Sequence, residues 1–364
     1  MFDTFFSNTS APTGGNYIIK STNGRKLFRI YIKPEKYGKF NWRFFFMNKM
    51  NSTFAQGEES YRNMECGQWT IHMASISHSD TIEPNEKVFG TKKVLFDGNE
   101  SKHVSTDEVF WSDPLEYEIN SGFLVWDWEV EGEKIPSMPD EIYSTFEYRN
   151  GEFVKEGNVP VPAMFGCDKK VKKKVGFIGD SITAGCQTPK DKYEMWVGRI
   201  STMLKDDYAV WNLGLGYARG SDFATFGSWF EKAKHNDVII MTFGVNDLCS
   251  GTYGAGRGSK ASEIIADDEK IIRALQECGI EVIISTIPPF HYSNEQKMEW
   301  RCANLAIHHL AKMYNCRVYD IESSLDIGEL NNERPFGDHP DSRGGEAAAN
   351  KFKETFCING EWNL

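Results

Sequence analysis

The sequence predicts two domains: an antiparallel β-sandwich of jelly-roll-like form, followed by an α/β domain built on a doubly wound parallel sheet of five strands. Three observations support this prediction. The chain has 364 residues, which is too long for one ordinary hydrophobic core. Short apolar runs separated by Gly, Asn, Asp and Ser clusters fill the first half. In the second half, apolar strand-like runs alternate with segments of helical periodicity.

In the first half, residues 1–16 are expected to form a loose arm and residues 17–160 the sandwich. The clearest alternation lies near the end of this region, where Trp126 and Trp128 share one face of a strand. We interpret these tryptophans as core residues, with an exposed sugar-stacking platform as the alternative. The expected strands are Tyr17–Ile19, Leu27–Ile32, Trp42–Phe46, Trp69–Ala74, Val94–Phe96, Tyr117–Ile119 and Phe123–Val130.

Residues 161–174 are expected to form a linker without secondary structure, because Pro162 is followed by a dense lysine run. Residues 175–364 then form the second domain. Ligands of such parallel sheets bind at the carboxyl ends of the strands. The expected strands are Val175–Ile178, Ala209–Leu213, Asp237–Phe243, Glu281–Ile287 and Arg317–Ile321, and the expected helices are Tyr193–Lys205, Asp222–Lys234, Ser262–Cys278, Asn294–Met313 and Gly345–Phe356.

The composition excludes several classes of partner. A formal net charge of −11 disfavours nucleic acid and anionic membranes, which require basic surfaces. No apolar run approaches the roughly 20 residues of a membrane span, and no signal peptide is recognisable, so we expect a cytoplasmic protein. The eight cysteines include no C-x-x-C pair, which favours buried free thiols over disulfides or a zinc site.

The stretch Val175–Gly185, VGFIGDSITAG, is the strongest functional pattern. An apolar strand ends in a tight turn that carries Ser181, and a helical segment follows. A serine in this position exposes its hydroxyl and leaves its backbone N–H free, as a covalent nucleophile requires. The alternative is an ordinary capping serine.

Three further loops follow other strands of the expected sheet. They are Asn212–Gly220 (NLGLGYARG), Gly244–Asp247 (GVND) and Pro335–Pro340 (PFGDHP). Acyl transfer needs a nucleophile, a base and donors for the developing oxyanion. Ser181 can serve as the nucleophile and His339 as the base. The Ser181 N–H, an N–H of the glycine-rich turn and the Asn246 amide can serve as donors.

The motifs GDSITAG, NLGLGYARG, GVNDL and GDHP, in this order, resemble those of the SGNH (GDSL-type) hydrolase superfamily over about residues 172–357. The resemblance implies a flavodoxin-like three-layer α/β/α fold and ester hydrolysis through an acyl-serine, with no metal and no cofactor. It also implies that Ser181 is the nucleophile, Asn246 an oxyanion donor and His339 the base. Asp180, the acid before the serine, is expected to shape the turn.

Two positions depart from the family pattern. The aspartate that often precedes the histidine by three residues is Phe336 here. Asp341 and Asp338 are therefore candidates to orient the ring, and a Ser–His dyad held by a backbone carbonyl, as in some carbohydrate esterases, is the interpretation we favour. The donor glycine expected five residues after the asparagine of NLGLGYARG is Tyr217. We expect Gly216 to be the oxyanion donor and keep Tyr217 as the alternative.

The remaining candidates are residues of the substrate pocket, a competing base, and two patterns that superficially suggest a phosphate loop and a metal site. Arg219 and Asp222 either shape the acyl pocket or form a structural ion pair, and His291 is a competing base. The glycine-rich residues 251–258 do not match a phosphate loop, and Cys302, His308 and His309 on one predicted helix do not match a metal site. The residues expected at the substrate pocket are Asp180, Tyr217, Arg219 and Phe290.

We therefore predict a serine esterase for short acyl esters, with an acetylated sugar or oligosaccharide as the expected partner. This substrate is implied by the resemblance of a β-sandwich before an SGNH domain to bacterial carbohydrate esterases. A lysophospholipase or thioesterase, a non-catalytic carbohydrate-binding protein, and acyl transfer to another alcohol are the alternatives. The sequence leaves open whether the protein is a homo-oligomer.

Overall fold

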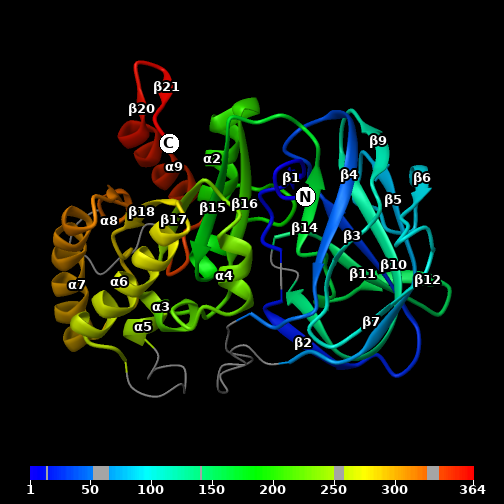
Figure 1. Cartoon of the computed structure of the whole chain (residues 1–364), viewed down its shortest axis with the longest axis horizontal. Coiled ribbons are helices and arrows are strands. Elements are labelled where there is room, and N and C mark those ends of the chain that lie inside the picture. The colour runs from blue at the N-terminus through cyan, green and yellow to red at the C-terminus, as the bar shows by residue number, and fades with distance from the viewer. Residues whose placement is uncertain (14, 52–64, 140–141, 250–257, 326–335) are drawn as a thin grey trace. The chain divides into compact units, whose positions relative to one another are not determined.

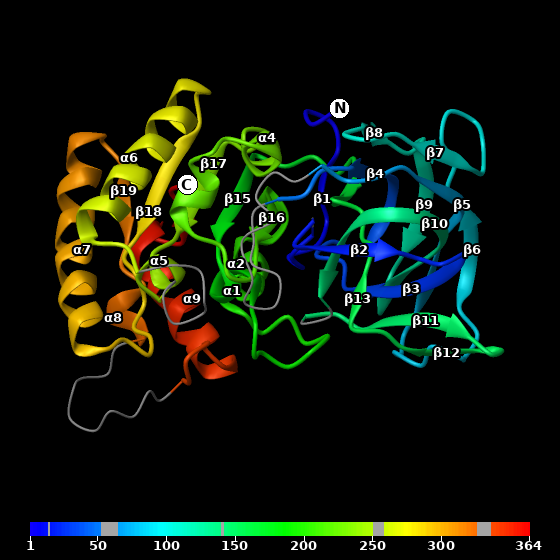
Figure 2. The same cartoon turned by 90° about the horizontal axis from the view of Figure 1, so that it is seen from below.

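The computed structural model describes residues 1–13, 15–51, 65–139, 142–249, 258–325 and 336–364, shown in two views in Figures 1 and 2. The chain forms two compact units. The N-terminal unit holds the described residues of Met1–Asn51, Asn63–Lys170 and Lys190–Tyr193, and the C-terminal unit holds those of Val171–Pro189 and Glu194–Leu364. No helix within these described ranges is long and apolar enough to cross a membrane.

The N-terminal unit is built from antiparallel strands in two sheets. The five-stranded sheet has the order β1-β14-β4-β8, with β9 also paired to β4. The nine-stranded sheet has the order β12-β11-β3-β10-β5-β6, with β2 and β13 paired to β10 and β7 paired to β5. The strands are β1 (Phe6–Ser7), β2 (Tyr17–Ser21), β3 (Lys26–Ile32), β4 (Gly38–Met47), β5 (Trp69–Ser79), β6 (Phe89–Lys93), β7 (Lys102–Val104), β8 (Val109–Trp111), β9 (Leu115–Ile119), β10 (Phe123–Pro139), β11 (Thr145–Arg149), β12 (Glu152–Lys155), β13 (Asn158–Val159) and β14 (Met164–Cys167).

Aromatic side chains from both sheets meet in the core of this unit. The rings of Phe44 on β4 and Trp126 on β10 have their centroids 4.5 Å apart, and those of Phe46 and Trp128 are 5.9 Å apart. Both tryptophans are fully buried, which confirms their interpretation as core residues. The alternation of β10 sends them to the inner face because successive side chains point to opposite sides of a strand.

The opposite face of the nine-stranded sheet contains a buried ion pair. Arg29 on β3 lies directly across from Asp127 on β10 in the strand register. Its Nε and one terminal nitrogen each donate to a carboxylate oxygen of Asp127 at 2.7 Å. The guanidinium also donates to the Pro84 carbonyl and lies 4.2 Å from the centre of the Phe153 ring. Both charges are therefore paired and removed from water.

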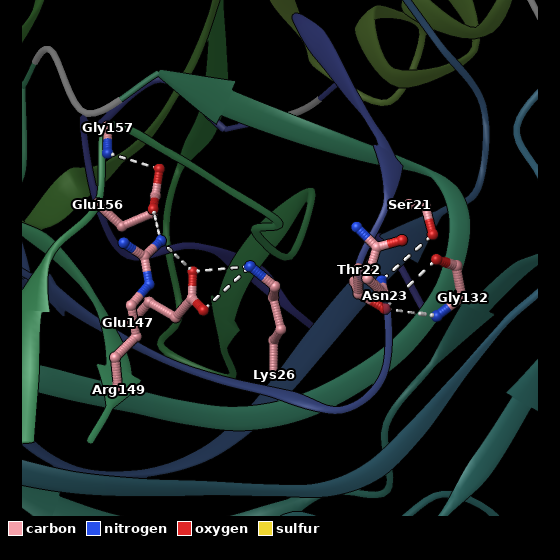
Figure 3. Close-up of polar contacts among 9 residues, drawn as sticks. All are labelled: Ser21, Thr22, Asn23, Lys26, Gly132, Glu147, Arg149, Glu156 and Gly157. Carbon is pink, nitrogen blue, oxygen red and sulfur yellow. Dashed lines mark hydrogen bonds and ion pairs between the residues drawn. The ribbon is translucent and has the colours of Figure 1, made fainter. Parts of the chain in front are cut away.

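A second polar cluster links the strands near one end of the same sheet (Figure 3). Lys26 on β3 donates to the Glu147 carboxylate on β11 at 3.1 Å. Arg149 on β11 pairs with Glu147 and with Glu156, which follows β12. Nearby, the Gly132 N–H donates to the Thr22 hydroxyl at 3.1 Å, joining β10 to the turn after β2.

Three expectations for the first half are wrong. Residues 1–16 are not a loose arm, because β1 pairs with β14 and residues 8–13 are buried. Val94 and Phe96 are buried, but Val94–Phe96 is not a strand, since the ladder of β6 ends at Lys93. The expected linker contains β14, whose four residues are buried and paired with β4.

The C-terminal unit alternates strands and helices. Its five parallel strands have the order β16-β15-β17-β18-β19, which is the order 2-1-3-4-5 of doubly wound sheets. The strands are β15 (Lys173–Gly179), β16 (Tyr208–Gly214), β17 (Val238–Thr242), β18 (Glu281–Ser285) and β19 (Arg317–Tyr319), with a terminal hairpin of β20 (Cys357–Ile358) and β21 (Glu361–Trp362). The helices are α1 (Ser181–Ala184), α2 (Trp196–Leu204), α3 (Gly220–Phe223), α4 (Ser228–Ala233), α5 (Val245–Cys249), α6 (Ala261–Glu277), α7 (Asn294–Met313), α8 (Glu322–Leu325) and α9 (Ser342–Phe356), with a 3₁₀ turn at Lys205–Asp207.

Two differences from the expected second half have local causes. The predicted helix Asp222–Lys234 is divided into α3 and α4, and Phe226 between them has a left-handed φ of 54° that a continuous helix does not allow. Lys190–Tyr193 belongs to the N-terminal unit although it lies within the expected second domain. The Asp191 carboxylate accepts from the Ser144 N–H at 2.8 Å, and the Tyr193 hydroxyl accepts from the Lys33 N–H at 3.0 Å.

Two further features of the chain are the eight cysteine thiols and the ion pairs of the lysine run that leads into β15. All eight cysteines are free, as predicted, but Cys278 and Cys302 are exposed rather than buried. In the lysine run, Lys172 pairs with Asp207 and Lys174 with Asp237. These ion pairs join β15 to the segments before β16 and β17.

We predict that Asp127→Ala destabilises the N-terminal unit by about 3–5 kcal/mol, because it leaves the Arg29 charge buried without a partner. The double variant Arg29→Met/Asp127→Leu should lose much less, since it leaves no buried charge. Hydrogen exchange of the β3 and β10 amides measures the loss in this unit. The exposed pair of Lys93 and Glu100 is the control, and Glu100→Ala should change exchange little. Equal losses in the single and double Asp127 variants would contradict the prediction.

Candidate active site

Ser181 occupies the turn between β15 and α1. The Asp180 carboxylate caps the one-turn helix by accepting from the Ile182 N–H at 2.9 Å. Ser181 is the first residue of α1, where helical N–H groups have no acceptor within the helix. Gly185 ends the helix with a left-handed φ of 101°. The turn therefore holds the serine at the carboxyl end of a central strand of the sheet.

His339 reaches this serine from the segment that precedes α9. The Ser181 Oγ and the His339 Nε2 are 2.7 Å apart, so the expected nucleophile and the expected base share a hydrogen bond. The ring of Phe290 meets the imidazole edge to face, at 5.7 Å between centroids. Burial lowers the pKa of His339 below its ordinary value of 6.5. The neutral imidazole is the form that can accept the serine proton.

The orienting partner expected for His339 is not found. Its buried Nδ1 has no hydrogen-bond partner among the described residues. The Asp341 carboxylate instead caps α9, accepting from the N–H groups of Arg343 and Gly344, and pairs with the Arg343 guanidinium. Because the Nδ1 is unpartnered there, neither Asp341 nor Asp338 nor a backbone carbonyl of the described chain holds the ring. The Ser–His pair of the favoured dyad is present, but the expected contact of an aspartate or a backbone carbonyl with Nδ1 is not found among the described residues.

The glycine-rich turn after β16 lies next to the serine turn. The Leu215 N–H donates to the Gly179 carbonyl at 3.0 Å, and the Ala218 N–H closes the turn on the Leu215 carbonyl. The Asn246 amide nitrogen, on α5, donates to the Ala218 carbonyl at 3.1 Å. This bond anchors the Asn246 side chain beside the glycine-rich turn. Three of the predicted motifs therefore converge at one end of the sheet.

Tyr217 takes the left-handed conformation that the family pattern gives to a glycine. Its φ is 62°, at the third position of the turn from Leu215 to Ala218. This position favours glycine or asparagine, and other residues are strained there. Gly216, the donor we expected, is not among the residues with positive φ. The side chain of Tyr217 is 36% exposed.

Asp247 connects the turn to the Asn246 motif, a role that the sequence analysis did not assign. Its carboxylate accepts from the N–H groups of Gly220 and Gly244, both at 3.1 Å. Burial raises its pKa to about 6 and that of Asp180 to about 7. Burial also raises the pKa of Asp268, with the nearby Asp247 as a further cause. The position of Asp247 directly after Asn246 in GVNDL was the sequence feature that could have indicated this role.

The other expected pocket residues have structural roles. Arg219 binds the buried Asp222 through two nitrogens, at 3.0 and 3.2 Å, so the ion-pair alternative is the one observed. Asp180 is 1% exposed and caps α1, so it does not line a pocket. Phe290 packs on His339, whereas His291 is exposed. Residues 250–257, which include most of the glycine-rich loop, and Pro335 lie outside the described residues.

No group of three or more His, Cys, Asp or Glu side chains within the described ranges could hold a metal ion. Cys302, His308 and His309 are all exposed on α7. The chemistry that the site can perform from its own residues is proton transfer between a serine and a histidine.

Comparison with known proteins gave matches to the C-terminal half. The model of the GDSL-like lipase/acylhydrolase family matches residues 177–347. Similar solved structures include the acetyl xylan esterase AlAXEase, at 24% identity over 50% of this chain and 98% of that chain, with a TM-score of 0.40. The acetylxylan esterase Axe2 from Geobacillus stearothermophilus has 18% identity over 54% and 98%, with a TM-score of 0.42. A lipolytic protein of the G-D-S-L family from Veillonella parvula has 20% identity over 50% and 97%, with a TM-score of 0.42. A search of curated proteins found no match.

We predict that Tyr217→Asn stabilises the protein by about 1 kcal/mol, because asparagine tolerates the left-handed conformation that strains tyrosine. Tyr217→Ala is the matched control, since alanine is strained in the same way and should give no gain. Urea denaturation of the three proteins measures the difference. A gain in the alanine variant equal to that in the asparagine variant would show that backbone strain is not the cause.

Proposed function

We propose, from the match of residues 177–347 to the GDSL-like lipase/acylhydrolase family model, that the chain is a serine esterase for short-chain acyl esters. The observation that carries the proposal is the 2.7 Å hydrogen bond between Ser181 and His339. It joins a hydroxyl at the end of a parallel strand to a half-buried imidazole whose pKa is lowered by burial. A serine and a base within hydrogen-bond reach are the arrangement of an activated nucleophile.

The reaction proceeds in two steps. The Ser181 Oγ attacks the ester carbonyl while its proton passes to the His339 Nε2. The negative charge on the carbonyl oxygen is stabilised by the Ser181 N–H, by the Asn246 amide and by an N–H of the turn at Gly216 or Tyr217. His339 then protonates the leaving alcohol. Water attacks the acyl-Ser181 ester with His339 again as base, and the acid is released.

The substrate we propose is an acetyl ester on a sugar or oligosaccharide. The support is the order of the two units, since a β-rich unit before an SGNH domain resembles the arrangement in bacterial carbohydrate esterases. A small acyl group is also consistent with Phe290, whose ring packs directly on the imidazole and limits the space beside it.

We predict that Ser181→Ala lowers kcat for p-nitrophenyl acetate by about 10⁴-fold or more, because the acyl-enzyme cannot form. Wild type should prefer acetate over butyrate and octanoate, and should release acetate from acetylated oligosaccharides. Ser293→Ala, at the exposed cap of α7, is the control and should keep full activity. Octanoate preference would favour a lysophospholipase or thioesterase. Equal rates in wild type and Ser181→Ala would reject the mechanism and leave a carbohydrate-binding protein.

We predict that kcat/KM for a short-chain ester falls on the acid side with a midpoint below pH 6.5. The base must be neutral, and burial lowers the pKa of His339, so activity persists to a lower pH than a solvated histidine allows. Phe290→Ala should move the midpoint up towards 6.5, because water then reaches one side of the ring. A wild-type midpoint above 6.5 would contradict the assigned environment of His339.

A further inference from the structure

The outer face of α7 carries the most exposed large apolar side chains of the described chain. Leu305 is 76% exposed, Met298 70% and Met313 59%. The opposite face of the same helix is buried and includes Trp300, Ile307 and Leu310. Figures 1 and 2 both show α7 beside α6 at the outer side of the C-terminal unit. Exposed apolar side chains gathered on one helix indicate an interaction surface, whereas scattered ones do not.

Six of the exposed residues of α7, which include Met298 and Leu305 but not Met313, follow the spacing of a helix–helix seam. Their separations alternate between three and four residues, which keeps them in one line along a helix. The line extends over about 26 Å at 1.5 Å per residue. We call it the α7 stripe, and its members, all exposed, are Glu295, Met298, Cys302, Leu305, His309 and Lys312.

The α7 stripe is complementary to itself when it is reversed. A two-fold axis midway between Ala303 and Asn304 places Cys302 opposite Leu305 of a second copy. The same axis places Met298 opposite His309, and the acidic Glu295 opposite the basic Lys312. Each contact occurs twice, as an isologous interface requires. Antiparallel helices also oppose their dipoles favourably.

The charges at the two ends of the stripe select this partner. Glu295 is 81% exposed and its one ion pair in the described chain is with the exposed Lys260, at 3.1 Å. Such an exposed pair contributes little and leaves carboxylate lone pairs for a second cation. A parallel copy would place like charges together at both ends, which is unfavourable. The antiparallel copy places opposite charges together at both ends of the stripe and apolar side chains together at its centre.

We propose that two copies of this chain associate through their α7 stripes, antiparallel and around this two-fold axis. The site of ester chemistry is formed by other elements, so the proposal does not depend on the proposed function. A single helix face is smaller than the roughly 1,200–2,000 Å² of a stable interface. We therefore expect a weak dimer in a concentration-dependent equilibrium with the monomer.

Sedimentation velocity over a concentration series of the full chain tests the proposal. We expect wild type to shift from monomer to dimer with concentration. Leu305→Glu should raise the dimer dissociation constant by at least about tenfold, because it places carboxylates at the apolar centre. Ile358→Glu is the matched control, since it changes an apolar side chain of similar exposure, 57%, on β20. It should leave association unchanged.

A charge reversal tests the antiparallel register. Glu295→Lys should weaken the dimer, because it opposes two cations at each end, and Glu295→Lys/Lys312→Glu should restore it. Circular dichroism of each variant checks that the fold is retained. A wild type that stays monomeric, a Leu305→Glu variant that still dimerises, or a double variant that is not restored would overturn the proposal. In the first case the stripe would have a different partner.

Discussion

Close packing of α1 on the end of the sheet is the constraint on which the site depends. Gly179 and Gly214 are partners in the register of β15 and β16. A Cβ at Gly179 would lie 2.2 Å from the Thr183 Oγ, and one at Gly214 would lie 2.4 Å from the Ala184 nitrogen. Only glycine fits at both positions. This contact lets the Leu215 N–H reach the Gly179 carbonyl, and that hydrogen bond brings the turn of Tyr217 next to Ser181.

Two buried carboxyl groups near this constraint, those of Asp180 and Asp247, have raised pKa values. An ionised carboxylate close to the site would oppose a developing negative charge. Burial raises the pKa of Asp180 to about 7 and that of Asp247 to about 6, so a proton can neutralise each near neutral pH. Unfolded aspartate has a pKa near 4, so between about pH 4 and 7 the folded state binds more protons. The contribution of these groups to stability is therefore present at acid pH and is lost as the pH rises towards 7.

The sequence predicted most elements of the C-terminal unit because its periodicity is strong there. The expected helix Asn294–Met313 and the observed α7 have the same first and last residues. Ser293 and Gln296 form a capping box that fixes its start. The apolar run Val94–Phe96 was misassigned because burial alone does not make a strand. The arm at residues 1–16 was misassigned because β1 depends on pairing with β14, far away in the chain, which no local pattern reveals.

For the site, motif spacing identified residues that the structure brings together, but it did not give side-chain direction. Asp341 is two residues from His339, yet its carboxylate turns back to cap α9. Asp247 was overlooked because a carboxylate beside an asparagine has no periodic pattern. The left-handed φ of Tyr217 is a property of the folded turn, which the sequence does not reveal. Local sequence therefore indicates which residues are available, and tertiary contacts decide their roles.

The unpartnered Nδ1 of His339 has a consequence for how this site differs from a triad. In a triad, a carboxylate on Nδ1 fixes the tautomer and stabilises the imidazolium that forms. Here the described chain holds the ring through the Ser181 hydroxyl on one side and the edge-to-face contact with Phe290. A buried N–H without an acceptor costs about 1–3 kcal/mol, and a catalytic role is one reason for a protein to keep such a group. Burial lowers the pKa of this imidazole, and no carboxylate of the described chain offsets that effect.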